Sequence, residues 1–97
     1  MIAINLDILK KFFSKEPIVR AWLFGSFARG EERADSDVDI LVQFDRDAKV
    51  GLLRHADILL RLEQLLHRKV DLVPENSIYP ELRQSINSSR VLIYERN

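Results

Sequence analysis

The sequence predicts one small α/β domain in which helices cover one face of a short sheet. Apolar stretches with helical spacing alternate with short runs of branched and aromatic residues, and 97 residues provide one hydrophobic core rather than two, so we expect residues 1–97 to form a single domain. One of the runs also carries two aspartates on the same side. That side of the sheet is therefore expected to be the functional one.

The first part of the chain predicts a helix followed by a buried strand. Apolar residues between positions 6 and 13 recur at helical spacing behind Asn5, a suitable N-cap, and the pattern has to stop before Pro17. Residues 18–24 (IVRAWLF) are rich in branched and aromatic side chains and end at a glycine, which is typical of a buried strand. We expect Trp22 to lie in the core.

A short helix over residues 26 to about 32 and a second strand over residues 37–44 (DVDILVQF) are expected next. Successive side chains of a strand point to opposite faces. Asp37 and Asp39 therefore share one face of this strand, and the other face carries the apolar residues Val38, Ile40, Val42 and Phe44. We expect the aspartate face to be open.

The second half of the chain predicts a long helix, a third strand, a short helix and a last strand, over residues 50–68, 69–73, 80–87 and 91–95. The apolar positions of the long helix span roughly 240° of its circumference at about 100° per residue, which is more than packing on one sheet requires. Either the last helix covers the surplus, or the surplus is a partner-binding surface.

Composition excludes several classes of function. The 15 basic and 15 acidic residues cancel, so the strongly basic footprint of a nucleic-acid-binding protein is absent and nucleic acid is disfavoured as a partner. Without cysteine there is no disulfide or cysteine zinc site, and His55 and His67 lie twelve residues apart, so we expect both on helix surfaces. Charges interrupt the apolar pattern near the N-terminus; we expect no signal peptide, no membrane span and a cytoplasmic protein.

Three carboxylates form the candidate metal site. Asp37 and Asp39 project from one face of a strand, about 6–7 Å apart at their bases, and repel each other unless a cation lies between them. Such ligands suit Mg²⁺, which typically takes one or two carboxylates together with substrate phosphates. Asp-x-Asp alone is also common at a solvated strand end, but Asp71 adds a charge inside the apolar run VDLV, where it needs a partner. If the third strand lies beside the second, Asp71 completes a cluster able to hold two metal ions.

A Gly-Ser pair precedes the aspartates. Gly25 permits close approach of the backbone to a ligand, and Ser26 offers a hydroxyl and an N–H near the start of a short helix, where phosphate oxygens are favoured. With ten residues between Ser26 and Asp37, the segment GSFARGEERADSDVDI resembles the Gly-Ser-x10-Asp-x-Asp signature of the DNA polymerase beta type nucleotidyltransferase superfamily. Asp71 falls where that family places its third carboxylate, and VLIYE resembles the last strand of the stand-alone minimal nucleotidyltransferases.

The resemblance implies a nucleotidyltransferase fold, with a small mixed sheet, helices on one face and the active site on the other. It also implies transfer of a nucleoside monophosphate from a nucleoside triphosphate, with Mg²⁺, to an acceptor hydroxyl that Asp71 helps to activate. The residues implied for catalysis and metal binding are Asp37, Asp39 and Asp71, and those implied for binding the triphosphate are Gly25, Ser26 and Arg29.

Minimal nucleotidyltransferases of this kind are usually encoded beside a HEPN-domain protein, and several such pairs act as toxin and antitoxin. The leading hypothesis is therefore an antitoxin that transfers AMP from ATP to a hydroxyl of a partner HEPN toxin, with tyrosine as the favoured acceptor. The alternative is an antitoxin that neutralises the toxin by binding alone. A transferase acting on RNA or a small molecule is disfavoured by the size and the zero net charge of the chain. The sequence leaves both homo- and hetero-oligomers open.

Overall fold

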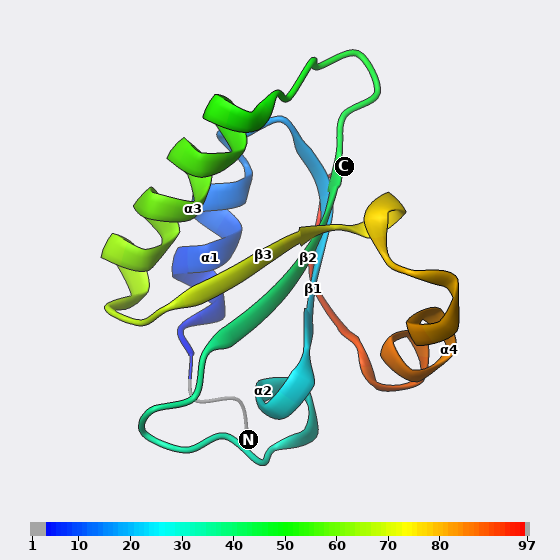
Figure 1. The fold of residues 1–97 in the computed structure, drawn as a ribbon. Coiled ribbons are helices and arrows are strands. Elements are labelled where there is room, and N and C mark those ends of the chain that lie inside the picture. The colour runs from blue at the N-terminus through cyan, green and yellow to red at the C-terminus, as the bar shows by residue number, and fades with distance from the viewer. Residues whose placement is uncertain (1–3, 97) are drawn as a thin grey trace.

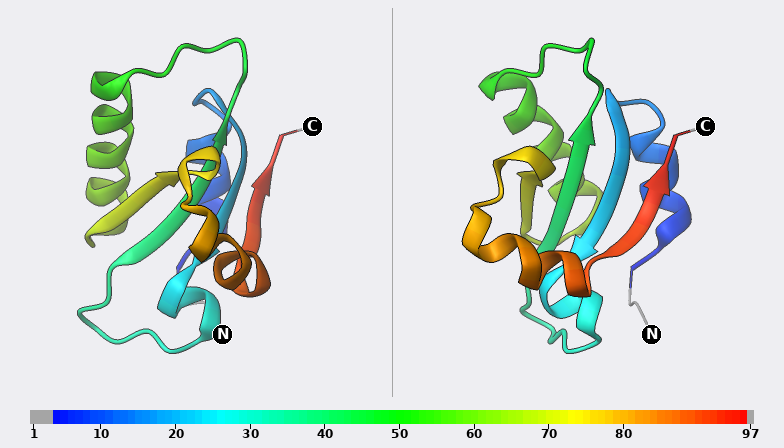
Figure 2. Two further views of the ribbon diagram at one scale, coloured as in Figure 1. Left: turned by 45° about the vertical axis from the view of Figure 1, so that its right-hand side comes forward. Right: turned by 90° about the vertical axis from the view of Figure 1, so that its right-hand side faces the viewer.

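The computed structural model describes residues 4–96, which form a four-stranded mixed sheet flanked by helices (Figures 1 and 2). The elements in chain order are α1 (Leu6–Phe13), β1 (Ile18–Phe24), α2 (Gly25–Arg29), β2 (Val38–Phe44), α3 (Leu52–Leu66), β3 (Val70–Pro74), the 3-10 turn η1 (Glu75–Ser77), α4 (Pro80–Ser89) and β4 (Val91–Glu95). The strand order is β3-β2-β1-β4, in which β1 is antiparallel to β2 and β4, and β2 is parallel to β3. The predicted α/β class and the predicted strands are confirmed.

Local signals set the ends of the helices. Asn5 caps α1 as predicted, because its side-chain oxygen accepts the Ile8 N–H at 3.2 Å. Helix α2 ends earlier than predicted because Gly30, with φ of 71°, forms a left-handed C-cap. Helix α3 likewise ends before the predicted residue 68, because His67 adopts φ of 54° at its C-cap.

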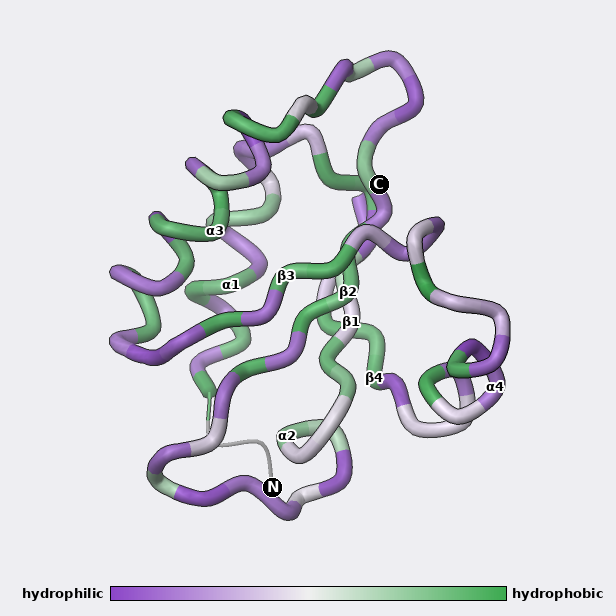
Figure 3. Tube along the Cα trace, in the orientation of Figure 1, coloured by the Kyte–Doolittle hydropathy of each residue, from purple (hydrophilic) through white to green (hydrophobic). Residues whose placement is uncertain are grey.

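The main core lies between the sheet and helices α1 and α3, which cover one face of it (Figure 2). Figure 3 shows hydrophobic residues along the strands and a mainly hydrophilic segment between α2 and β2. The largest fully buried side chains are Phe13, Phe27, Leu9, Ile18, Leu23, Ile40, Leu41, Ile58, Leu62, Val38 and Val42. The apolar face predicted for β2 therefore does point into the core.

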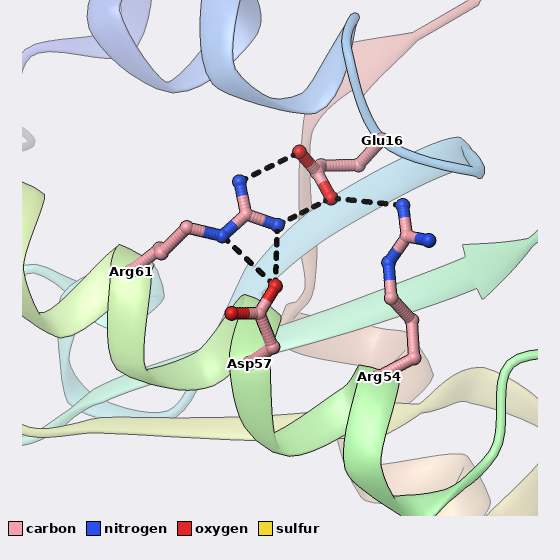
Figure 4. Close-up of polar contacts among 4 residues, drawn as sticks. All are labelled: Glu16, Arg54, Asp57 and Arg61. Carbon is pink, nitrogen blue, oxygen red and sulfur yellow. Dashed lines mark hydrogen bonds and ion pairs between the residues drawn. The ribbon is translucent and has the colours of Figure 1, made fainter.

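An ionic network fastens α3 to the turn between α1 and β1 (Figure 4). The side chain of Glu16 is only 6% exposed and accepts hydrogen bonds from Arg61 Nη1 and Nη2 at 2.9 and 2.8 Å. Asp57 accepts a further bond from Arg61 Nε at 3.1 Å, and Arg54 Nη2 lies 3.5 Å from Glu16. Because Glu16 is nearly buried, the bidentate arginine is what balances its charge.

The opposite face of the sheet carries α4 and η1, with α4 beside α2 (Figure 2). One of the two alternatives left open for the long helix is excluded as a result, and the prediction that Trp22 lies in the core is wrong. Because α4 lies across the sheet from α3, it does not cover the surplus apolar surface of the long helix, and Leu52 and Leu53 stay 85% and 87% exposed. Trp22 is only half-buried, because strand alternation turns it away from the face of the core residue Leu23, and the guanidinium of Arg90 lies 4.5 Å from its ring centroid.

The two histidines differ in their surroundings. His67 is exposed, as predicted. His55 is half-buried instead, with Nε2 lying 2.9 Å from the carbonyl oxygen of Leu72 and its ring packed edge-on against Phe44. It helps to hold the beginning of α3 to β3. Within residues 4–96, no helix has the length and apolar character needed to cross a membrane.

Candidate active site

The turn from β1 into α2 is built on Gly25. Its φ of +68° lies in the left-handed region, which a residue with a side chain adopts only at a cost. A Cβ added at this position would also lie 2.1 Å from Oδ2 of Asp39, far inside contact distance. Glycine is therefore required here both by the backbone conformation and by the carboxylate packed against it.

The ladder between β1 and β2 brings the Gly-Ser turn and the aspartates together. Asp39 lies on β2 opposite Phe24, the last residue of β1, so Gly25 and Ser26 follow directly beyond it. Asp39 is half-buried, whereas Asp37 is exposed and immediately precedes the strand. The ten-residue spacing of the sequence motif is spanned by α2 and the polar segment that leads back to β2.

Asp71 is brought to the same place by β3. In the parallel register of β2 and β3, Asp39 and Asp71 are direct partners, and partners in neighbouring strands point to the same face. The expectation that the third strand lies beside the second is confirmed. Asp71 itself is exposed, so it can reach a ligand or solvent without being buried in the apolar run around it.

The crowding of carboxylates changes the protonation of Asp39. The pKa of Asp39 is raised to about 6, first because burial disfavours the charged carboxylate, and then because Asp71 and Asp37 add negative charge. The positive charge of Arg29 opposes this shift. A cation bound beside Asp39 would relieve the same repulsion.

The carboxylates suit a metal ion that is completed by its substrate. Among residues 4–96, no three acidic, histidine or cysteine side chains are gathered closely enough to enclose a metal ion by themselves. Mg²⁺ does not need such a cage, because it is commonly held by one or two carboxylates together with waters and substrate phosphates. The donor set of Asp39 and Asp71, with Asp37 two residues away, therefore fits Mg²⁺ bound jointly with a nucleotide.

Two arginines lie near these groups. Arg29, predicted as a phosphate contact, is exposed at the end of α2 and donates from Nε to Glu31. Arg68 was not among the predicted site residues, yet its guanidinium contacts the segment that leads into Asp37 and lies over the ring of Phe27. Its position depends on contacts between residues more than thirty apart, for which the sequence carries no local signal.

The chain is similar in sequence to known nucleotidyltransferases. Residues 6–93 match the nucleotidyltransferase domain family. The chain is 38% identical over 72 residues to the putative protein adenylyltransferase MJ1379 of Methanocaldococcus jannaschii, covering 73% of this chain and 72% of that protein. It is 41% identical over 64 residues to the protein adenylyltransferase MntA of Thermococcus cleftensis, covering 66% of this chain and 63% of that one.

Solved structures share the fold. A structure of a putative minimal nucleotidyltransferase is 38% identical, with a TM-score of 0.72 over 92% of this chain and 96% of that one. A toxin–antitoxin structure with AMP-PNP is 22% identical, with a TM-score of 0.81 over 97% and 76% of the two chains. A complex of a tri-AMPylated HEPN toxin with its MNT antitoxin, from Shewanella oneidensis, is 20% identical, with a TM-score of 0.69 over 95% and 71%. At these two lower identities the likeness is one of fold.

Proposed function

This chain belongs to the nucleotidyltransferase domain family, and from that premise we propose that it transfers AMP from ATP to a hydroxyl of a HEPN-domain toxin and so acts as its antitoxin. The observation that carries the proposal is the register pairing of Asp39 with Asp71 beside the Gly25-Ser26 turn. The protein adenylyltransferase MntA, a relative by sequence, and the AMPylated HEPN toxin bound to an MNT protein of the same fold support the choice of reaction and partner.

Asp39 and Asp71, with Asp37 two residues away, would hold Mg²⁺ together with the phosphates of ATP. When bound, Mg²⁺ supplies stabilisation of the leaving pyrophosphate and lowers the pKa of the attacking hydroxyl. Asp39 would be the main ligand, because it is half-buried beside the Gly25 turn, is paired with Asp71 and has its negative charge opposed by neighbouring carboxylates. Asp37 and Asp71 are exposed and can each turn toward the substrate.

The chain's other groups bind and orient ATP. Gly25 and Ser26 would contact the β and γ phosphates at the turn, and Arg29 would add a positive charge beside them. Because Arg29 is paired with Glu31, the phosphates would have to displace an acidic side chain of the same protein.

The transfer itself forms one bond and breaks another. The acceptor oxygen attacks the α phosphorus of ATP, the bond from that phosphorus to the bridging oxygen breaks, and pyrophosphate leaves with the electron pair. The hydroxyl proton passes to the exposed Asp71 carboxylate. We further propose that residues 1–97 act as one domain and that the partner brings the acceptor, a tyrosine close to its own active site, so docking supplies the required orientation.

Transfer of radiolabel tests the reaction. The protein and its HEPN partner are incubated with ATP labelled at the α phosphorus and Mg²⁺, with Asp39→Asn as the matched inactive control. Label on the partner that depends on Asp39 and is removed by a chelator supports the proposal. A partner that stays unlabelled while it is inhibited in a stable complex would contradict transfer and establish neutralisation by binding.

A further inference from the structure

The segment between α2 and β2 determines where Asp37 lies. Asp37 precedes the strand, so the ladder of β2 does not fix it. Within the segment, Arg33 N–H donates to the Ser36 hydroxyl at 2.8 Å and Ser36 N–H donates to the Arg33 carbonyl at 3.1 Å. These bonds tie the turn to itself and not to the sheet.

Arg68 supplies a connection from this segment to the rest of the fold. It lies between α3 and β3, and its Nη1 donates to the carbonyl oxygens of Ala34 at 3.1 Å and Ser36 at 3.3 Å, with that of Arg33 at 3.5 Å. The neighbouring Lys69 carbonyl accepts the N–H of Val38 at 2.9 Å. The residues just before β3 thus hold the segment on both sides of Asp37.

The guanidinium of Arg68 is itself held in place. Its Cζ lies 5.2 Å from the ring centroid of Phe27, within the range of a cation–π contact, and Phe27 is a fully buried residue of α2. The start of β3 is also fixed, because Glu63 on α3 accepts the N–H of Val70 at 3.0 Å. Arg68 therefore joins α2, the segment before Asp37 and the beginning of the strand that carries Asp71.

We propose that Arg68 is a positioning residue for nucleotidyl transfer: through the carbonyls of residues 33–36 it fixes Asp37 relative to Asp39 and Asp71. This inference rests on the function proposed above. All three carbonyl contacts come from one nitrogen, so a lysine ammonium, with three donors on a stem one bond shorter, can keep part of these contacts, whereas it loses the planar group over Phe27. A methionine keeps the packing of the side-chain stem but has no donor.

The test compares Arg68→Met with Arg68→Lys. AMP transfer to the HEPN partner is measured as kcat and KM, and hydrogen exchange is followed by mass spectrometry over residues 33–38. For Arg68→Met we expect kcat to fall roughly 10–100-fold, KM for the partner to change less than about twofold, and exchange in the segment to accelerate. For Arg68→Lys we expect a rate and a protection clearly above those of Arg68→Met, because part of the carbonyl contacts is kept.

Arg96→Gln is the matched control. It removes a 2.7 Å ion pair to Asp45, a residue that follows the other end of β2, so the rate should stay at the wild-type level. An unchanged rate in Arg68→Met, or an equal loss in the methionine and lysine variants, would overturn the positioning role while leaving the proposed function standing. If the wild-type protein transfers no AMP, the proposed function fails first, and the role of Arg68 in it fails too.

Discussion

Replacing Gly25 by alanine should have two effects: backbone strain, which lowers the stability of the fold, and displacement of the Asp39 carboxylate, which lowers the rate of AMP transfer. Alanine at φ of +68° is strained by about 1–2 kcal/mol. Its Cβ would also meet Asp39 Oδ2 at 2.1 Å, so the carboxylate has to withdraw by at least about 1.3 Å to reach an ordinary contact of 3.4 Å. Since misplacing a catalytic group by about 1 Å can reduce a rate on the order of 100-fold, we expect a loss of that size in AMP transfer.

Gly30→Ala is the control for the backbone term. Gly30 has a nearly identical φ of +71°, but a Cβ there would meet nothing within 4 Å. For Gly30→Ala we expect the free energy of unfolding to fall by about 1–2 kcal/mol, which lowers the melting temperature by roughly 4–8 °C for each kcal/mol. The transfer rate of this variant should stay close to that of the wild type. Gly25→Ala should be destabilised at least as much.

A double-mutant cycle isolates the carboxylate. In an Asp39→Ala background the oxygen that meets the new Cβ is gone, and the remaining Asp39 Cβ lies at an ordinary 3.4 Å. The excess destabilisation of Gly25→Ala over Gly30→Ala should therefore vanish in that background. If the excess persists without the carboxylate, or if Gly25→Ala transfers AMP at the wild-type rate, the described packing of Asp39 against the turn is wrong.

Further predictions concern the charged groups. In the metal-free protein, Asp39→Asn should raise the melting temperature at pH 7.5 and have little effect near pH 4. The reason is that the pKa of Asp39 is raised to about 6, so ionisation of this carboxyl destabilises the fold progressively between about pH 4 and pH 6. Scanning calorimetry with a chelator measures both effects, and equal effects at the two pH values would contradict this. Asp71→Asn should reduce the transfer rate by a factor of roughly 100 or more, because it removes a metal ligand and the group that accepts the hydroxyl proton; a wild-type rate in a labelling assay would remove Asp71 from the site. Arg61→Ala should lower the free energy of unfolding in urea by about 1–3 kcal/mol, because it leaves the nearly buried Glu16 with only the longer contact to Arg54. Asp57→Asn, which removes an exposed carboxylate, should lower it by less than about 1 kcal/mol, and equal losses in the two variants would contradict the network in Figure 4.

Much of the fold could be predicted from local patterns. Branched and aromatic runs ending at glycine or proline identified the strands to within about one residue, because burial on a sheet selects such residues whatever the topology. The alternation of β2 separated the core residues Val38, Ile40 and Val42 from Asp37 and Asp39, although Leu41, on the face of Asp39, is fully buried as well. The Gly-Ser-x10-Asp-x-Asp spacing then identified the turn and the strand that the structure brings together at Gly25 and Asp39.

What could not be predicted depends on the tertiary arrangement. Periodicity predicts a helix over residues 80–87 but not which side of the sheet the helix occupies. The sequence therefore left open what covers the long helix, and it placed Trp22 in the core, where the structure does not. The contact between Gly25 and Asp39 and the connection made by Arg68 each join residues that only the folded chain brings together. Sequence spacing alone carries no distance for such pairs.

Intact-mass spectrometry of the HEPN partner tests the central claim most directly. After incubation with the wild-type protein, ATP and Mg²⁺, the partner should gain one or more units of about 329 Da, the mass of an added AMP group, and peptide mapping should place them on one tyrosine. Asp39→Asn should leave the partner's mass unchanged. An unmodified partner with the wild-type protein, or modification that continues with Asp39→Asn, would contradict transfer at the site formed by Asp39 and Asp71.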